Sequence, residues 1–330
     1  MNKYGRQLFI IRDWGQKLGF NIEMWKCLQE YYGLENIDLL VLPNDADVVD
    51  QIKKSILKVK PAKIFMDSRI FIVDSKIFSL TKHLSQVSEL NRILKENQII
   101  PICVVTDAQA PGYCLVAELI VHGIGFIIPI GSEFKYRSLN KGRKIGGLFN
   151  PVSLETGAYI MSKAVAKSKD LYLGGSLYEP RKSFILETTK ELKGTGIQLE
   201  ISPKKSNTYN EYLLELAQHK IVLNTNFIAE SKEVHMVGRN IETFHSGSLL
   251  ITQDTPLLTK YFTRGEHYIH ANSPHEVGKL VKYYLKHEEE AEGISLEGQK
   301  RAMDYARGKY FMKSIEEKTR SVHGGVGIEI

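Results

Sequence analysis

The stretch VGRNIETFHSGSLLITQDTP, residues 237–256, predicts an amphipathic helix that ends at a glycine and leads into a buried strand. Val237, Ile241 and Phe244 recur at the spacing of one helix face, and Gly247 is the residue type that commonly ends a helix. The run SLLITQD that follows is largely apolar, as expected of a strand covered on both faces of a parallel sheet. The stretch therefore indicates an α/β fold.

The same alternation of buried strand and amphipathic helix continues along the chain. In the first half, strands are expected at 7–13, 37–43, 62–67, 99–107 and 125–131, and helices near 21–32, 47–59, 79–97 and 112–122. In the second half, strands are expected at 170–176, 197–202, 221–226, 248–254 and 268–271, and helices at 180–193, 209–219, 235–246, 274–287 and 295–318. Strands that alternate with helices favour right-handed βαβ units and parallel sheets.

The segment 132–168 interrupts this alternation with Gly, Asn, Pro and basic residues, so we expect two domains. Residues 1–150 are assigned to a first Rossmann-like domain, 151–169 to a junction, 170–315 to a second Rossmann-like domain, and 316–330 to the end of the last helix and a tail. Two such domains in tandem place the carboxyl ends of their strands across a cleft. Open α/β sheets bind ligands outside those ends, so the cleft is the expected binding site.

The composition is that of a soluble globular protein, with 43% hydrophobic and 25% charged residues among 330. A net charge of +6 favours anionic ligands such as a nucleotide, and leaves open a peripheral contact with an anionic membrane surface. The basic residues are dispersed rather than gathered in a stripe, so no nucleic-acid partner is expected. Three cysteines without Cys-x-x-Cys spacing fit a reducing compartment, and the apolar segment 119–131 is too short for a membrane helix. We expect a cytoplasmic protein.

A glycine turn followed by cations opens the second half of the chain. The strand at 170–176 contains Gly174 and Gly175 near its end, and the next helix has Arg181 and Lys182 in its first turn. Glycines allow a ligand to approach the backbone closely. Cations at a helix N-terminus oppose the helix dipole, so they are unfavourable for the helix alone but suitable for binding a pyrophosphate. The alternative is a strand-to-helix turn with solvated charges.

Arg239 and Glu242 lie one turn apart, off the apolar face of their helix. That helix follows the strand at 221–226 and a polar loop, which points its N-terminus at the cleft, where orphan amides favour an anion. An Arg there can bind a phosphate and a Glu can accept hydrogen bonds from a ribose diol, so the pair suits a nucleotide diphosphate. Asn224, at the end of the strand before the helix, and His235, at the start of the helix, are further donor-binding candidates. A surface ion pair, and for His235 a plain surface position, are the alternatives.

Three motifs follow one another in the second half: LYLGGSLYEPR, YNEYLLELAQHKIVLN and GRNIETFHSGSLLITQDTPLLTKYFTRGEHYIHANSPHEVGKLVKYYLKH. Their order resembles the carboxyl-terminal domain of spore-maturation-protein-type glycosyltransferases, a branch of the GT-B class with two Rossmann domains. The resemblance covers 170–315. It implies a nucleotide-sugar donor site in the second domain, an acceptor and catalytic base supplied by the first, no bound divalent metal, and no cofactor apart from the nucleotide-sugar substrate.

The candidates in the first domain depend on position alone, because that domain resembles no family. Asp13 follows the first strand, beside Trp14 in the glycine-containing segment RDWGQKLGF, and Asp107 ends the fourth. A carboxylate at a strand end could act as general base for an acceptor hydroxyl, whereas the alternative for each is a helix N-cap or turn residue. Asp45 and Asp47 are interpreted as N-cap residues, and no histidine spacing suggests zinc, so no metal site is expected.

The sequence thus predicts a metal-independent glycosyltransferase that moves a sugar from a nucleotide-diphosphate sugar to a carbohydrate or another hydroxyl acceptor. Two alternatives remain open. A UDP-sugar epimerase of the same fold would also hold a nucleotide diphosphate, but it requires acid and base groups beside the sugar. A non-catalytic protein that binds sugar nucleotides or carbohydrates would keep the site without the chemistry.

Overall fold

The computed structural model describes residues 5–44, 47–71, 80–106, 111–131, 143–146, 148–162, 166–175, 177–202, 208–227, 234–305 and 307–323. The chain divides into two compact units, unit 1 with residues 1–151 and 308–330, and unit 2 with residues 152–307. Each unit contains one five-stranded sheet whose strands pair in parallel. The predicted α/β class with two Rossmann-like sheets is confirmed. Within the described ranges, no helix has both the length and the apolar character needed to cross a bilayer.

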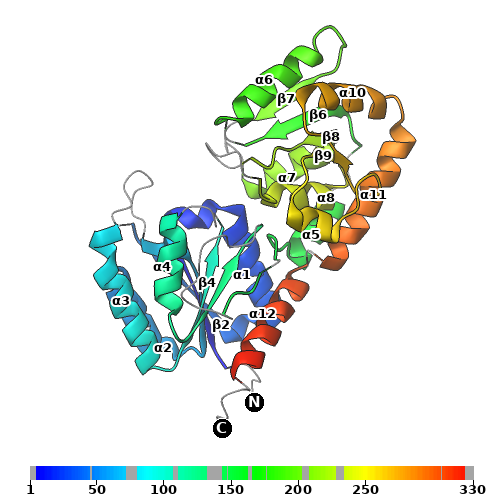
Figure 1. Cartoon of the computed structure of the whole chain (residues 1–330). Helices are drawn as coiled ribbons and strands as arrows, with labels where there is room; N and C mark the ends of the chain where they lie inside the picture. Colours follow the sequence, from blue (N-terminus) through cyan, green and yellow to red (C-terminus); the bar gives the residue numbers. More distant parts are fainter. Residues whose placement is uncertain are drawn as a thin grey trace. The chain divides into compact units, whose positions relative to one another are not determined.

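Unit 1 has the strand order β2-β1-β3-β4-β5 with helices on both faces of its sheet (Figure 1). Helices α2, α3 and α4 pack on one face, and α1 and α12 pack on the other. Its strands are β1 (Gln7–Arg12), β2 (Ile37–Leu42), β3 (Lys63–Asp67), β4 (Ile100–Val105) and β5 (Phe126–Pro129). Its helices are α1 (Gly19–Tyr32), α2 (Val48–Val59), α3 (Leu80–Glu96), α4 (Pro111–Val121) and α12 (Gly308–His323), with 3-10 turns η1 (Asp13–Lys17), η2 (Leu34–Asn36) and η3 (Ser68–Phe71).

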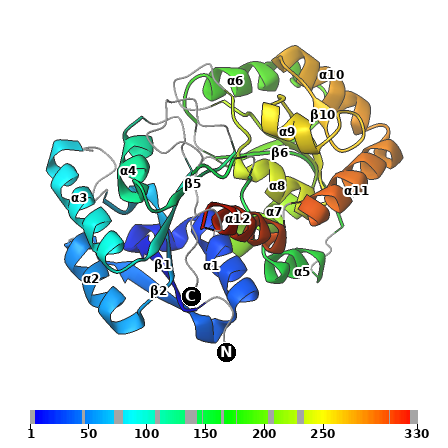
Figure 2. The same ribbon diagram turned by 60° about the horizontal axis from the view of Figure 1, so that its bottom comes forward.

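Unit 2 has the strand order β10-β9-β8-β6-β7. Helices α6 and α10 pack together on one face of its sheet, while α5, α7 and α8 pack against one another on the other (Figure 2). Helix α11 packs against α8 and also contributes Ala291 and Ile294 to the core under α6 and α10. Its strands are β6 (Lys169–Gly174), β7 (Leu199–Ser202), β8 (His219–Leu223), β9 (Leu249–Thr252) and β10 (Ile269–His270). Its helices are α5 (Leu154–Ser162), α6 (Arg181–Glu191), α7 (Tyr209–Gln218), α8 (Gly238–Ser246), α9 (Pro256–Tyr261), α10 (Pro274–Tyr284) and α11 (Glu288–Tyr305).

The last predicted helix, 295–318, is two helices, and the chain returns to unit 1 between them. Residues 308–315, assigned above to the second domain, belong to α12 in unit 1. Gly308 allows this return because α12 begins against Cys27 of α1, where an added Cβ would lie 2.3 Å from the Cys27 Sγ. Farther along α12, the buried Glu316 carboxylate accepts a hydrogen bond from Lys63 Nζ at 2.5 Å.

Two short helices lie where the sequence analysis predicted none. Helix α5 lies within the segment predicted as the junction, and Ser153 Oγ accepts a hydrogen bond from the amide of Thr156 in its first turn at 3.1 Å. Helix α9 starts at Pro256, with the Thr255 hydroxyl as its N-cap. Nine and six residues are too few to show a clear apolar period, although a Thr-Pro pair is a recognisable helix start.

Candidate functional site

Two guanidinium groups meet at the carboxyl end of β6 in unit 2. Gly174 ends that strand, and Gly175 follows it with a φ of +104°. A Cβ added at Gly175 would lie 2.3 Å from Arg239 Nη2 and 3.2 Å from Arg181 Nη1. A side chain at this position would therefore displace the Arg239 guanidinium and crowd that of Arg181. The structure thus brings together four residues that were predicted from separate segments of the sequence.

Arg181, the first residue of α6, is held from the end of β8. Its Nε donates to Thr225 Oγ1 at 2.7 Å and its Nη2 donates to the Thr225 carbonyl at 3.1 Å. Its guanidinium also lies over the ring of Tyr178, 4.7 Å from the centroid. The residue is only 4% exposed. Burial, and then the positive charge of Arg239, lower the pKa of Arg181 to about 10, so the group stays charged at neutral pH in a field that favours an anion.

Arg239, the second residue of α8, is held by Asn224, the residue directly before Thr225 at the end of β8. Its Nη1 donates to Asn224 Oδ1 at 3.0 Å, and its Nε donates to the Tyr212 hydroxyl at 3.3 Å. The N-cap residue of α8 is Val237, which has no polar side chain to satisfy the first amides of the helix. The positive end of this helix and the Arg239 guanidinium therefore both favour negative charge.

A chain of buried amides supports these contacts. Asn224 Nδ2 donates to Asn240 Oδ1, and Asn240 Nδ2 donates to Asn226 Oδ1 at 3.0 Å. The backbone N–H of Asn226 then donates to Gln253 Oε1 at 2.9 Å. All four side chains are at most 5% exposed. Because their partners fix their orientation, the network holds the Arg239 side chain in one position.

Glu242 is joined to Arg239 through a tyrosine. The hydroxyls of Tyr209 and Tyr212 donate to the two carboxylate oxygens of Glu242, at 3.1 and 2.9 Å, and Tyr212 also accepts the hydrogen bond from Arg239. Burial, and then the charge of Glu242, raise the pKa of the Tyr212 phenol well above its ordinary value, so the phenol remains a donor. Arg239 and Glu242 are both half-buried parts of one network, not an exposed ion pair.

Two other predicted donor residues lie outside this set of contacts. Lys182 is exposed on α6 next to the buried Arg181. His235 is half-buried and lies beside the bridge between Phe227 and Val234, where its backbone amide donates to the Asn226 carbonyl at 2.9 Å. Ligand roles for Lys182 and His235 stay predictions.

The acceptor-side candidates belong to unit 1. Asp13 begins η1 after β1, is exposed, and accepts a hydrogen bond from Gln16 Nε2 at 2.7 Å. Asp107 and Asp45 lie outside the described residues. The N-cap interpretation of Asp47 is confirmed, because its side chain accepts from the Asp50 amide at 3.0 Å. In the part of the chain that the structure describes, no three metal-binding side chains are grouped.

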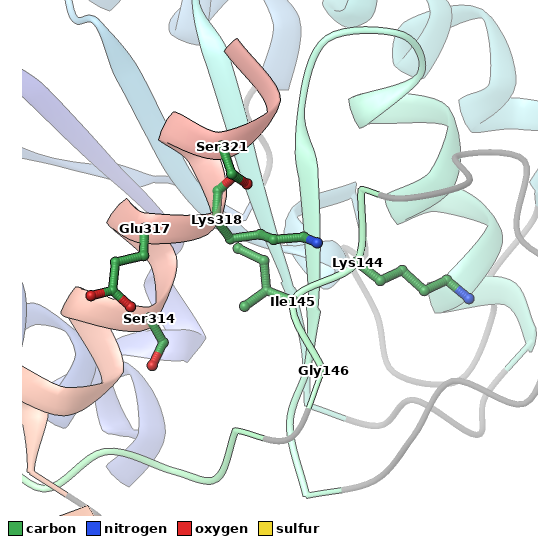
Figure 3. Close-up of a pocket in the computed structure, with 7 residues that line it drawn as sticks. All are labelled: Lys144, Ile145, Gly146, Ser314, Glu317, Lys318 and Ser321. Atoms are coloured by element: carbon green, nitrogen blue, oxygen red, sulfur yellow. The ribbon is translucent and has the colours of Figure 1, made fainter. Parts of the chain in front are cut away.

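An open pocket in unit 1 does not have the character of a site. It lies between α12 and the segment that follows β5. In Figure 3, the Lys318 side chain extends from α12 toward that segment, whereas the Lys144 side chain extends away from α12. Its polar groups therefore do not converge on one point. The lining residues are Lys144, Ile145, Gly146, Ser314, Glu317, Lys318 and Ser321.

Most of the residues that position the two arginines were not predicted from the sequence. These are Tyr178, Tyr209, Tyr212, Thr225, Asn226, Asn240 and Gln253. The polar run NTN at 224–226, directly after a strand that is otherwise apolar, was the available signal. The tyrosines carried none, because positions 209 and 212 are ordinary for an amphipathic helix.

Residues 181–316 match a family model described as "Glycosyl transferase-like". No curated protein matches the chain. Among solved structures, HepE of Anabaena in complex with UDP is similar with a TM-score of 0.61 at 10% identity, covering 96% of this chain and 100% of that one.

Two further structures share the fold. An alpha-glucosyltransferase in complex with UDP-glucose and DNA containing an abasic site has a TM-score of 0.61 at 8% identity, covering 95% of this chain and 99% of that one. A putative UDP-N-acetylglucosamine 2-epimerase from Listeria monocytogenes has a TM-score of 0.52 at 12% identity, covering 96% and 97%. The chain thus contains a glycosyl transferase-like segment, most of it in unit 2, and shares its fold with these structures over nearly its whole length.

Proposed function

We propose that the protein is a glycosyltransferase of the GT-B class and takes its sugar from a nucleotide diphosphate bound at the carboxyl ends of the strands of the second sheet. The observation that carries the proposal is the pair of guanidinium groups at Gly175, each held by its own residue of the NTN segment. A diphosphate is the ligand that two fixed, adjacent guanidinium groups suit, because each can form charge-assisted hydrogen bonds to phosphate oxygens.

The same two groups would assist the reaction. When the bond between the sugar and the diphosphate breaks, negative charge accumulates on the leaving phosphate oxygens. Arg181 and Arg239 are already oriented by Thr225 and Asn224, so they would stabilise that charge without reorganisation. No metal or cofactor is needed for this step in the proposal. An acceptor hydroxyl would supply the nucleophile, with Asp107 or Asp13 as the predicted base.

Uridine is the first nucleobase to test, because HepE was solved with UDP and with UDP-glucose. Glu242 is assigned the ribose diol, since a carboxylate held by two tyrosines retains lone pairs that can accept further hydrogen bonds. Three buried cysteines without disulfides fit a cytoplasmic location, which we also propose. The narrower resemblance to spore-maturation-type enzymes and contact with an anionic membrane stay predictions.

Titration calorimetry with UDP tests the donor site. Arg239→Lys keeps the charge but loses the fork of donors, so we expect the Kd for UDP to rise about tenfold, whereas Lys190→Ala, which removes an exposed cation from α6, should leave it unchanged. Glu242→Gln should weaken UDP more than 2′-deoxy-UDP. Wild-type affinity of Arg239→Lys and Glu242→Gln for both ligands would refute the assignment.

The epimerase alternative has weaker support, because the similar epimerase has a TM-score of 0.52 against 0.61 for HepE. Incubating the protein with UDP-N-acetylglucosamine and no acceptor distinguishes the two reactions. An epimerase would produce the epimeric sugar, and a transferase would not. A protein that binds UDP but turns over no UDP-sugar, with or without glycan acceptors, would support the non-catalytic alternative.

A further inference from the structure

Gln253 carries a hydrogen-bond donor for which the described residues provide no acceptor. The residue follows β9 and is only 5% exposed. Its side-chain Oε1 accepts from the backbone N–H of Asn226 at 2.9 Å, and its backbone carbonyl accepts from Asn226 Nδ2 at 2.6 Å. These contacts fix which end of the side-chain amide is nitrogen. That Nε2 is buried and has no hydrogen-bond partner among the described residues.

Such a donor calls for an explanation. A buried N–H group without an acceptor costs about 1–3 kcal/mol, and unsatisfied groups are rare in folded proteins. A smaller or apolar residue at position 253 would avoid this cost, but it would also lose the acceptor that holds the backbone N–H of Asn226. An acceptor oxygen supplied by a ligand would satisfy Nε2 while that hold is kept.

The position of Gln253 identifies which part of a ligand it would meet. Side chains alternate between the two faces of a strand. Leu223 and Ile251 belong to the core under α6 and α10, so Thr225 and Gln253, two residues farther along, continue on that side. Thr225 does contact Arg181 of α6. At the carboxyl ends of the strands, β9 lies next to β8, so Gln253 is one strand beyond Asn224 and Thr225, the residues that hold the arginines.

Glu242 lies on the opposite side. It belongs to α8 and contacts tyrosines of α7, and both helices cover the other face of the sheet. A diphosphate on Arg181 and Arg239 has two ends, one carrying the nucleoside and one carrying the sugar. With the ribose directed toward Glu242, the sugar is directed toward the other side, on which Gln253 lies.

We infer that Gln253 Nε2 donates a hydrogen bond to an oxygen of the transferred sugar, which makes Gln253 a specificity-determining residue for the donor. This inference rests on the proposed function. A fixed neutral donor distinguishes sugars that present an acceptor oxygen at one position from deoxy sugars that lack it there, because the amide is left unpaired with the wrong sugar.

The test compares UDP with UDP-sugars by titration calorimetry on three proteins. Gln253→Glu keeps the acceptor for Asn226 but replaces Nε2 by oxygen, and Gln253→Met removes both ends of the amide. Gln299→Met is the matched control, because the Gln299 amide already donates to the His245 carbonyl. The readout is the affinity for UDP-glucose, or for the tightest of a panel of UDP-sugars, divided by the affinity for UDP. This ratio removes any effect that the new carboxylate has on the diphosphate.

We expect the ratio to fall about fivefold to tenfold in both Gln253 variants and to stay unchanged in Gln299→Met. Deoxy analogues of the same sugar should identify one hydroxyl whose loss weakens the wild type but not Gln253→Met. An unchanged ratio in a folded Gln253→Met protein would overturn the inference, as would equal weakening of UDP and UDP-sugar. If the wild type binds neither UDP nor any other nucleoside diphosphate or nucleotide sugar, the proposed function itself fails, and the inference with it.

Discussion

Asn240 links the fold of unit 2 to its candidate site, and replacing it by alanine should affect both. The side chain is fully buried and bonded at both ends of its amide. Asn240→Ala leaves the Asn224 Nδ2 donor and the Asn226 Oδ1 acceptor buried and unpaired. At about 1–3 kcal/mol each, the expected loss is roughly 2–6 kcal/mol, a large share of the ~5–15 kcal/mol that stabilises a typical domain.

The two tryptophans allow the loss to be assigned to one unit. Trp14 and Trp25 both belong to unit 1, so tryptophan fluorescence reports on that unit, whereas far-ultraviolet circular dichroism reports on both. In urea, where the slope is about 2 kcal/mol per molar, the Asn240→Ala protein should unfold in unit 2 about 1–3 M earlier. The fluorescence transition should move little. Affinity for UDP should fall as well, because Asn224 would no longer hold Arg239 in one position.

Thr243→Val on the same helix is the control. The Thr243 hydroxyl donates only to the Arg239 carbonyl one turn earlier in α8, at 2.7 Å, so its loss should cost about 1 kcal/mol or less. If Asn240→Ala unfolds with the same two midpoints as Thr243→Val and binds UDP like the wild type, the buried amides do not position the arginine.

Three other positions can be tested by single substitutions. Glu316→Gln leaves the buried Lys63 ammonium without its counter-charge, so the fluorescence-detected unfolding of unit 1 should lose about 3 kcal/mol; a loss below about 0.5 kcal/mol would contradict this. Burial and the adjacent Glu200 raise the pKa of Glu215 from 4.5 to about 7. Between these two values the folded state binds a proton that the unfolded state has released. Stability should therefore fall as the pH rises through 7, and thermal melts at pH 5.5 and 8 should differ less in Glu215→Gln than in the wild type. Gly175→Ala would place its Cβ 2.3 Å from a guanidinium nitrogen at a φ of +104°, so the Kd for UDP should rise about tenfold or more by calorimetry, and an unchanged Kd would separate this turn from the ligand.

Local patterns predict most of the fold because the central strands of a doubly wound sheet are apolar on both sides. The run predicted as a strand at 248–254 forms β9 at Leu249–Thr252, and the predicted helix at 47–59 is α2 at Val48–Val59. The return of α12 to unit 1 has no such local signal. It depends on the Glu316 contact with Lys63 and on the packing of Gly308 against Cys27, which join residues more than 250 positions apart.

The same division holds for the candidate site. Arg181 could be selected from the sequence because a cation in the first turn opposes the helix dipole, and Arg239 because its helix follows a strand and a polar loop, which places the helix N-terminus at the expected binding site. Asn240 and Tyr212 show no anomaly. Their role depends on partners 16 and 30 residues away, Asn224 and Glu242, and a pairing of that kind appears only once the strands are in register.

The two arginines reach one point because consecutive residues of a strand face opposite sides. Asn224 lies on the side covered by α8 and holds Arg239, while Thr225 lies on the side covered by α6 and holds Arg181. Two helices on opposite faces of a sheet are kept apart by the sheet along its length, and their first turns come together only beyond its edge. The dipeptide at the end of β8 therefore serves as a common anchor, and the spacing of the two cations is set by the strand period rather than by either helix. A diphosphate of fixed length requires such a spacing, and this ties the proposed chemistry to the order of the strands.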